Sequence, residues 1–107
     1  MMDTPLLSIC IPSYNRPEEL YRLLKSIDIK ANDKVEIVIC EDYAPRREEV
    51  RQQVNKFKLE SNYKICYHEN EKLGGGGYDR NLRQCIRQAS GKWIMFMGDD
   101  DMFVSDT

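Results

Sequence analysis

The sequence has few of the ligands that a structural metal site or a disulfide framework requires. It contains one histidine, and its four cysteines, Cys10, Cys40, Cys66 and Cys85, include no Cys-x-x-Cys pair. A structural zinc ion takes four such ligands, whereas Cys66 and His68 offer two. Wide spacing without a secretory leader also argues against disulfides. We therefore expect reduced thiols that fill the core as small hydrophobes.

Basic clusters and long apolar runs are also missing. No Lys/Arg cluster is interleaved with aromatic residues, and the formal net charge is −2, so no nucleic-acid partner is expected. The N-terminal MMDTPLLSIC has an acid where a signal peptide needs positive charge, and its apolar run is too short to cross a membrane. We expect a cytoplasmic protein with no membrane segment.

The remaining composition is that of an ordinary globular domain. Hydrophobic residues make up 41% and charged residues 32% of the 107 positions. This balance excludes a disordered or membrane-spanning chain, and the length fits one domain. The same length is small for a complete enzyme that acts on two substrates.

Apolar periodicity predicts alternating strands and helices. Four short apolar runs with turn-forming borders read as strands, the first of them closed by Pro12; they are Leu6–Ile11, Val35–Cys40, Tyr63–Tyr67 and Trp93–Met97. Between them, apolar residues recur at helical spacing after Pro17, after Pro45 and up to a stop at Ser90-Gly91. The order β-α-β-α-β-α-β predicts an α/β fold with a mostly parallel sheet.

Polar, glycine-rich or acidic segments follow all four predicted strands. They read PSYNR, EDY, HENEKLGGGG and GDDD in chain order. Parallel sheets bind ligands beyond the carboxyl ends of their strands. We therefore expect a binding site at that edge of the sheet.

Three consecutive carboxylates, Asp99, Asp100 and Asp101, follow the last strand. Two charges about 5 Å apart repel by roughly 3 kcal/mol at an effective dielectric near 20, so a partly buried cluster needs a cation or raised pKa values. Carboxylate oxygens suit Mg²⁺ or Mn²⁺, which shares its coordination with substrate phosphates. The alternative is a solvated acidic turn.

Three residues near the other strand ends are candidates for nucleotide contacts. Tyr14 could stack on a base or merely anchor its loop, and Asn15 beside it is interpreted as a local cap. Asp42 could accept a hydrogen bond from a base N–H or simply form a turn. Arg80, at the start of the third helix, could lie near the nucleotide or be an exposed first-turn arginine.

The glycine run Gly74–Gly77 fits neither common phosphate-binding loop. The dinucleotide fingerprint needs G-x-G-x-x-G after the first strand, and a P-loop needs a following Lys-Ser/Thr. We expect a mobile or closely approached loop beside the site, with a surface linker as the alternative.

Four separated segments carry a family resemblance. They are LLSICIPSYNRPEELYRLLKSI, VEIVICED, NEKLGGGGYDRNLRQCI and ASGKWIMFMGDDD, in this order. Together they resemble the nucleotide-binding N-terminal half of family 2 glycosyltransferases, and the FMGDDD ending is similar to the abequosyltransferase-like subgroup. The resemblance implies a Rossmann-like GT-A fold and inverting transfer of a sugar from a nucleotide-diphosphate sugar to an acceptor hydroxyl.

The resemblance also implies roles for individual residues and a Mg²⁺ or Mn²⁺ cofactor. The base would be bound by Pro12, Tyr14 and Asp42, the base or diphosphate would lie near Arg80, the ribose would face Asp99, and the metal would be held by Asp100 with support from Asp101. One departure is that the family's Asp-Asp-Gly-Ser after the second strand is Glu41-Asp42-Tyr43-Ala44 here.

The resemblance further implies that residues 1–107 form only the nucleotide-sugar-binding half. The acceptor-binding half and the general base would lie beyond residue 107, so no catalytic residue is expected within the chain. The acceptor would be a saccharide or lipid-linked saccharide in cell-surface polysaccharide synthesis.

Two other functions stay open from the residues themselves. One is a non-catalytic receiver-like module that binds a nucleotide or phosphate, although a receiver needs acids where this chain has Pro-Ser-Tyr-Asn. The other is an interaction domain whose binding site has decayed.

Overall fold

The computed structural model describes residues 5–28, 32–71 and 77–98. These residues form four strands, three α-helices and one short 3₁₀ helix, in the predicted order. They are β1 (Leu7–Ser13), α1 (Pro17–Ser26), η1 (Asn32–Lys34), β2 (Val35–Glu41), α2 (Arg47–Glu60), β3 (Lys64–Glu69), α3 (Gly77–Gln88) and β4 (Trp93–Phe96).

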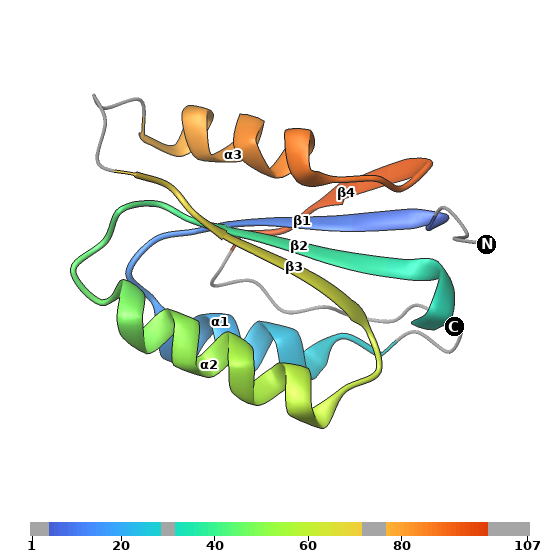
Figure 1. Ribbon diagram of the computed structural model, residues 1–107, viewed down its shortest axis with the longest axis horizontal. Coiled ribbons are helices and arrows are strands. Elements are labelled where there is room, and N and C mark those ends of the chain that lie inside the picture. The colour runs from blue at the N-terminus through green and yellow to red at the C-terminus, as the bar shows by residue number, and fades with distance from the viewer. Residues whose placement is uncertain (1–4, 29–31, 72–76, 99–107) are drawn as a thin grey trace.

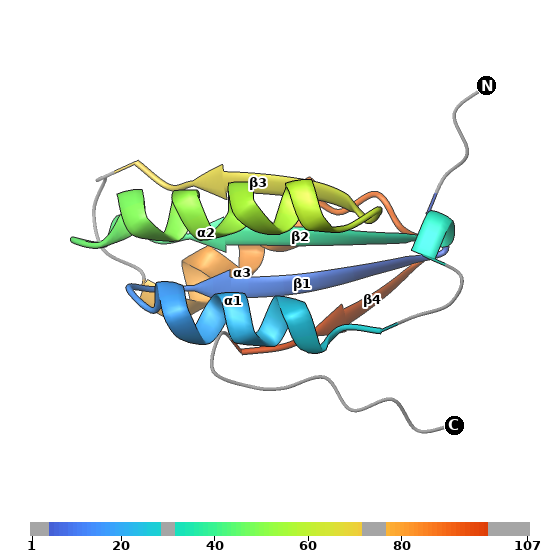
Figure 2. The ribbon, with the colours of Figure 1, turned by 90° about the horizontal axis from the view of Figure 1, so that it is seen from below.

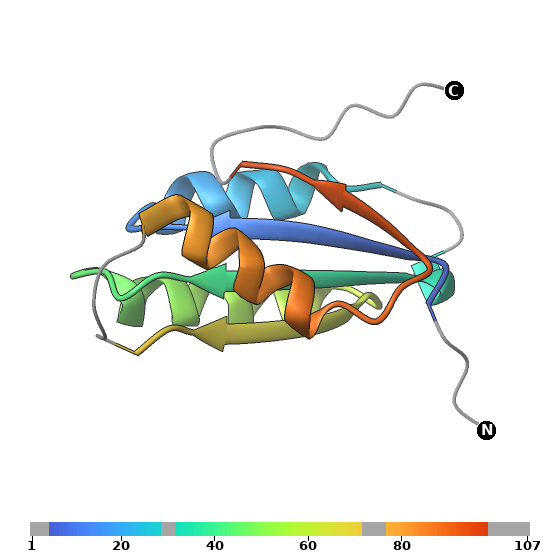
Figure 3. The same cartoon turned by 90° about the horizontal axis from the view of Figure 1, so that it is seen from above.

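The four strands make one sheet in the order β3-β2-β1-β4, and all three neighbouring pairs are parallel. Helices α1 and α2 cover one face and α3 covers the other (Figure 1). The view from below places α1 and α2 in front of the sheet, and the view from above places α3 there (Figures 2 and 3). The predicted α/β fold with a parallel sheet is confirmed.

The larger core lies between the sheet and helices α1 and α2. Side chains alternate between the faces of a strand, so β1 and β2 each send every second residue into this core. The predicted helical stripes meet them there. Buried members include Ile9, Ile11, Ile37, Ile39, Leu20, Leu23, Leu24, Val50, Val54 and Phe57. Within the described part of the chain, no helix combines the length and apolarity needed to cross a membrane.

The smaller core lies beneath α3 and is rich in sulfur. Cys10, Cys40 and Cys85 are fully buried there with Val38, and Cys66 packs against them at the border. All four cysteines are free thiols, as the sequence predicts. Burial raises the pKa of Cys10 to about 12, so this thiol stays protonated and unreactive near neutral pH.

Strand β1 continues through Pro12 to Ser13, so the expectation that Pro12 ends it is wrong. The carbonyl of Cys10 accepts from the Met97 amide on the β4 side, whereas the carbonyl of Ser13 accepts from the Asp42 amide on the β2 side. Because backbone groups alternate in direction along a strand, Pro12 faces β4. Its missing N–H therefore costs the β1–β2 ladder nothing.

Candidate functional site

The predicted binding residues that precede position 99 lie at the carboxyl edge of the sheet. The Asp42 amide donates to the Ser13 carbonyl (3.0 Å), which joins the ends of β2 and β1. Tyr14 is 53% exposed just beyond β1, and Arg80 is half-buried in the first turn of α3. Pro12 is buried within β1.

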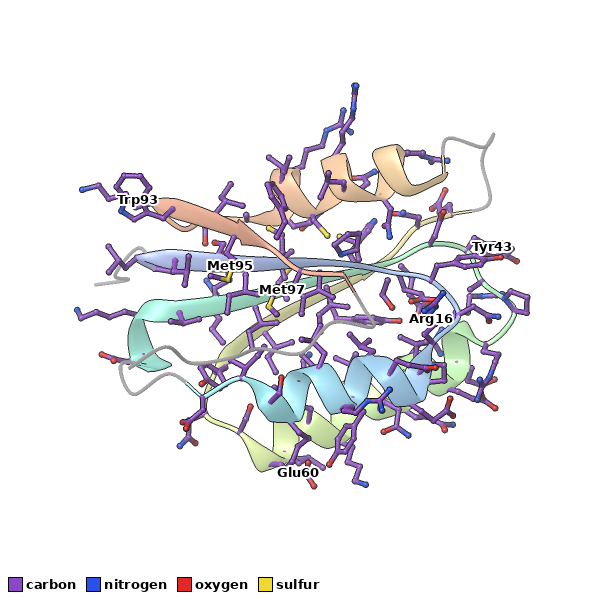
Figure 4. All side chains as sticks on the ribbon, turned by 180° about the vertical axis from the view of Figure 1, so that it is seen from behind. Arg16, Tyr43, Glu60, Trp93, Met95 and Met97 are labelled. Carbon is purple, nitrogen blue, oxygen red and sulfur yellow. The ribbon has the colours of Figure 1, made fainter. Side chains whose placement is uncertain are left out.

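Two labelled side chains show where this edge lies. Arg16 and Tyr43 stand at the carboxyl ends of β1 and β2, and Trp93 lies at the opposite end of the sheet (Figure 4). The structure thus brings together the loops after β1 and β2, which the sequence predicts because parallel strands share one carboxyl edge.

The turn after β2 presents the carboxylate of Asp42, although Tyr43 makes this turn bulky. The Tyr43 amide donates to Oδ1 of Asp42 (3.0 Å), and the Arg47 guanidinium carbon lies 4.0 Å from the centroid of the Tyr43 ring. Within the described residues Oδ2 of Asp42 has no hydrogen-bond partner. The departure from Asp-Asp-Gly-Ser therefore leaves one oxygen of Asp42 available to accept a hydrogen bond.

Asn15 does not cap its own helix, so its interpretation as a local cap is wrong. Its Oδ1 accepts from the backbone amide of Arg46, 31 residues away (2.8 Å). Its own amide donates to Oε2 of the buried Glu41 (2.8 Å). Asn15 instead connects the loop after β1 to the loop after β2.

A buried amide network holds three strand ends beneath α3. Nδ2 of Asn81 donates to the carbonyls of Cys40 (2.8 Å) and Ser13 (3.1 Å), and its Oδ1 accepts from Nδ2 of Asn70 (2.7 Å). Both asparagines are almost fully buried. No periodic pattern in the sequence indicates this network.

Substitution of Asn81 with leucine should lower the free energy of unfolding by about 2–4 kcal/mol, because it leaves buried carbonyl and amide groups without partners. Urea denaturation measures this loss. Gln84→Leu, one turn further along α3, is the matched control and should stay within about 0.5 kcal/mol of wild type. Equal stability of the two variants would contradict a structural role for the network.

A second pair of residues fixes α2 to the end of β3. Nε and Nη2 of Arg51 each donate to the Glu69 carboxylate at 2.8 Å, and the Tyr67 hydroxyl donates to Oε2 of Glu69 (2.9 Å). The hydrogen bonds from Arg51 lower the pKa of Glu69, whereas burial and the Glu69 charge raise the pKa of Tyr67. Glu69 therefore stays ionised and paired.

The acidic triplet Asp99, Asp100 and Asp101 lies outside the described residues, as do Gly74–Gly76. Up to that point β4 leads toward the carboxyl edge, and the Met97 amide still pairs with the Cys10 carbonyl of β1 (3.0 Å). Three carboxylates that directly follow such a strand fit Mg²⁺ or Mn²⁺ by residue type. Residues 5–28, 32–71 and 77–98 contain no cluster of three or more potential metal ligands.

Comparison with protein families gives a match over almost the whole chain. Residues 8–107 match the sequence profile of glycosyl transferase family 2. Abequosyltransferase RfbV of Salmonella typhimurium is 30% identical over 102 residues, which cover 95% of this chain and 30% of that protein. The chain thus spans about a third of the length of such relatives.

Solved structures share the fold. The mannosyltransferase PcManGT from Pyrobaculum calidifontis, solved with GDP-Man and Mn²⁺, has a TM-score of 0.80 at 17% identity, over 97% of this chain and 30% of that one. S. aureus TarS 1–349, solved with UDP, has a TM-score of 0.72 at 24% identity, over 91% of this chain and 28% of that one. Both are GT-A glycosyltransferases, so the GT-A expectation for the fold is confirmed.

Proposed function

This chain belongs to glycosyl transferase family 2, and on that premise we propose that it forms the nucleotide-sugar side of an inverting glycosyltransferase. The whole enzyme would move a sugar from a nucleotide-diphosphate sugar to the hydroxyl of a saccharide or lipid-linked saccharide, in cell-surface polysaccharide synthesis. The observation that carries the proposal is the junction of the loops after β1 and β2 at one edge, through the Asp42–Ser13 hydrogen bond.

The base contacts are proposed for the residues at this junction. The exposed ring of Tyr14 would stack on the base, and Pro12 would line the base pocket. Asp42 would accept the base N–H through Oδ2, since Oδ1 holds the Tyr43 amide. Arg80, in the first turn of α3, would lie near the base or diphosphate.

The remaining contacts are proposed for the acidic triplet. Asp99 would face the ribose, Asp100 would hold Mg²⁺ or Mn²⁺, and Asp101 would support that coordination. A bound divalent cation neutralises charge that develops on the diphosphate leaving group. The Mn²⁺ in the PcManGT structure supports the use of such an ion within this fold.

The acceptor-binding part and the general base are proposed to belong to the remaining length that relatives have. The exposed side chains of β4 support this division. Trp93, Ile94, Met95 and Phe96 are 39–64% exposed in an edge strand, which is unusual for consecutive large apolar residues. We propose that the acceptor-binding part packs against them. Figure 4 shows Trp93 and Met95 on this strand.

Calorimetry on the 107-residue chain tests the proposal. Titration with UDP, dTDP, GDP and CDP, each with and without Mn²⁺, should reveal one preferred nucleotide whose binding depends on the metal. We expect a dissociation constant on the order of 0.1–1 mM, because only one side of the site is present. Sugar transfer by this chain alone should be undetectable.

Failure of all four nucleotides to bind with Mn²⁺ would contradict the proposal and favour an interaction domain with a decayed site. Family membership does not favour the receiver-like module, and a phosphodonor labelling assay should leave the chain unlabelled. A cytoplasmic location is proposed as well, supported by four free thiols of which three are fully buried.

A further inference from the structure

Asn15 joins the loops after β1 and β2 by two hydrogen bonds, of which it donates one and accepts the other. Its amide donates to Oε2 of Glu41, and its Oδ1 accepts from the amide of Arg46, both at 2.8 Å. Glu41 ends β2, and Arg46 immediately precedes α2. Asn15 therefore holds both ends of the segment 41–46, which contains Asp42.

The backbone conformation of Asn15, like its side-chain hydrogen bond, favours an asparagine at this position. Its φ angle is +59°, in the left-handed region that asparagine, aspartate and glycine adopt more readily than other residues. Tyr14 directly precedes this turn. The conformation of Asn15 thus sets the direction that the chain takes directly after Tyr14.

One of the two hydrogen bonds of Asn15 ends on a buried group, whereas the bond from the Arg46 amide is exposed. Glu41 is fully buried, and a hydrogen bond to a buried carboxylate is among the stronger ones in proteins. Arg46 also donates two hydrogen bonds to Glu18 (2.7 and 3.2 Å), but the two side chains are 42% and 64% exposed. Such exposed pairs contribute little.

We propose that Asn15 is a positioning residue for the nucleoside, which it serves by fixing the separation of Tyr14 and Asp42. With both loops held, one residue stacks on the base while the other accepts its N–H, and little order has to be gained on binding. This inference rests on the proposed function. The diphosphate and metal would contact other groups, so the loss of Asn15 should affect recognition of the base and leave that of the phosphates unchanged.

The test compares the preferred nucleoside diphosphate with inorganic pyrophosphate, both with Mn²⁺, by calorimetry. Asn15→Gly keeps the left-handed backbone but lacks Oδ1, and it should weaken nucleotide binding about tenfold while pyrophosphate binding stays the same. Asn15→Asp keeps both the backbone preference and an acceptor for the Arg46 amide, so it should bind nucleotide as wild type does. Arg46→Ala retains that amide and is the matched control.

Each alternative outcome has a distinct meaning. Equal weakening of nucleotide and pyrophosphate binding by Asn15→Gly would indicate a general structural defect and overturn the inference. Unchanged nucleotide binding would overturn it while leaving the proposed function intact. Absence of nucleotide binding by the wild-type chain would overturn both. If Asn15→Gly does not fold, Asn15→Asp carries the test, and a tenfold loss there would contradict the inference.

Discussion

Replacing Glu36 with alanine should lower the free energy of unfolding by about 3 kcal/mol, a large share of the stability of a domain of this size. Glu36 is 2% exposed within β2, on the face toward α3. Its carboxylate accepts from the Ser8 hydroxyl (2.6 Å) and from the Ser90 amide (2.8 Å). The alanine variant would leave the buried Ser8 hydroxyl without this acceptor and would remove the acceptor of the Ser90 amide.

The network around Glu36 aligns β4 with β1. Ser90 and Gly91 form the turn between α3 and β4, and the Gly91 amide donates to the Ser8 hydroxyl (2.7 Å). Lys64 completes the surroundings, with Nζ 3.6 Å from Oε1 of Glu36. Since β4 runs toward the carboxyl edge, where the metal site is proposed, loss of this network should also disturb that site.

Urea denaturation at pH 7 measures the effect, with Glu36→Gln as a variant of similar shape and Glu71→Ala as the control at an exposed position. We expect a loss of about 1–2 kcal/mol for the glutamine and less than about 0.5 kcal/mol for Glu71→Ala. A Glu36→Ala chain as stable as the control would contradict the structural role of the network.

The pH dependence of stability provides an independent measurement on the same residue. Burial by itself raises the pKa of Glu36, but the hydrogen bonds from Ser8 and Ser90 together outweigh it, so the net pKa is lowered. The carboxylate therefore contributes stability above its unfolded pKa of about 4.3, and this contribution is lost as the pH falls through the lower folded pKa. The stability difference between wild type and Glu36→Gln should shrink below pH 4.

The elements of the fold could be predicted from the sequence because burial decides them. The apolar stripe of α2 and the continuous apolar runs of β1 and β2 leave one compatible arrangement, with helices on both faces of a parallel sheet. The end of β1 was harder to predict. Pro12 lacks an N–H, and this interrupts a strand only where that N–H would have faced a paired neighbour. That depends on where β4 leaves the sheet, which no local pattern reveals.

The location of the site was also predictable, whereas the contacts that shape it were not. Tyr14 and Asp42 had to share an edge because their strands are parallel neighbours. The hydrogen bond from Arg46 to Asn15 joins residues 31 positions apart and follows no period. Glu36 is the one charged residue inside the otherwise apolar run VEIVIC. This could have indicated a buried carboxylate, although periodicity alone does not.

Gly91 illustrates a correct prediction with a different physical cause. The sequence marks Ser90-Gly91 as a helix stop, and α3 does end just before it, at Gln88. The structure explains the glycine by close approach, because a Cβ at this position would lie 2.7 Å from the Ser8 backbone nitrogen and 2.9 Å from the Leu7 carbonyl carbon. The glycine is therefore required by packing against β1.

Replacing Asp100 with alanine should remove most of the metal-dependent part of nucleotide binding, at least about tenfold in affinity, while any metal-independent binding persists. A cation bound to Asp100 would relieve the repulsion among the three adjacent carboxylates. The alanine variant would therefore lose both a metal ligand and this relief. Asp101→Ala should have a smaller effect if Asp101 only supports the coordination.

Calorimetry of the preferred nucleoside diphosphate with and without Mn²⁺ measures this difference. Asp33→Ala is the matched control, because Asp33 is an exposed acid in η1, which precedes β2 at the amino edge of the sheet. It changes the net charge by the same amount at a position far from the carboxyl edge. Equal Mn²⁺ dependence in the Asp100→Ala and Asp33→Ala chains would mean that the acidic triplet is a solvated turn, and the proposed metal site would then have to be rejected.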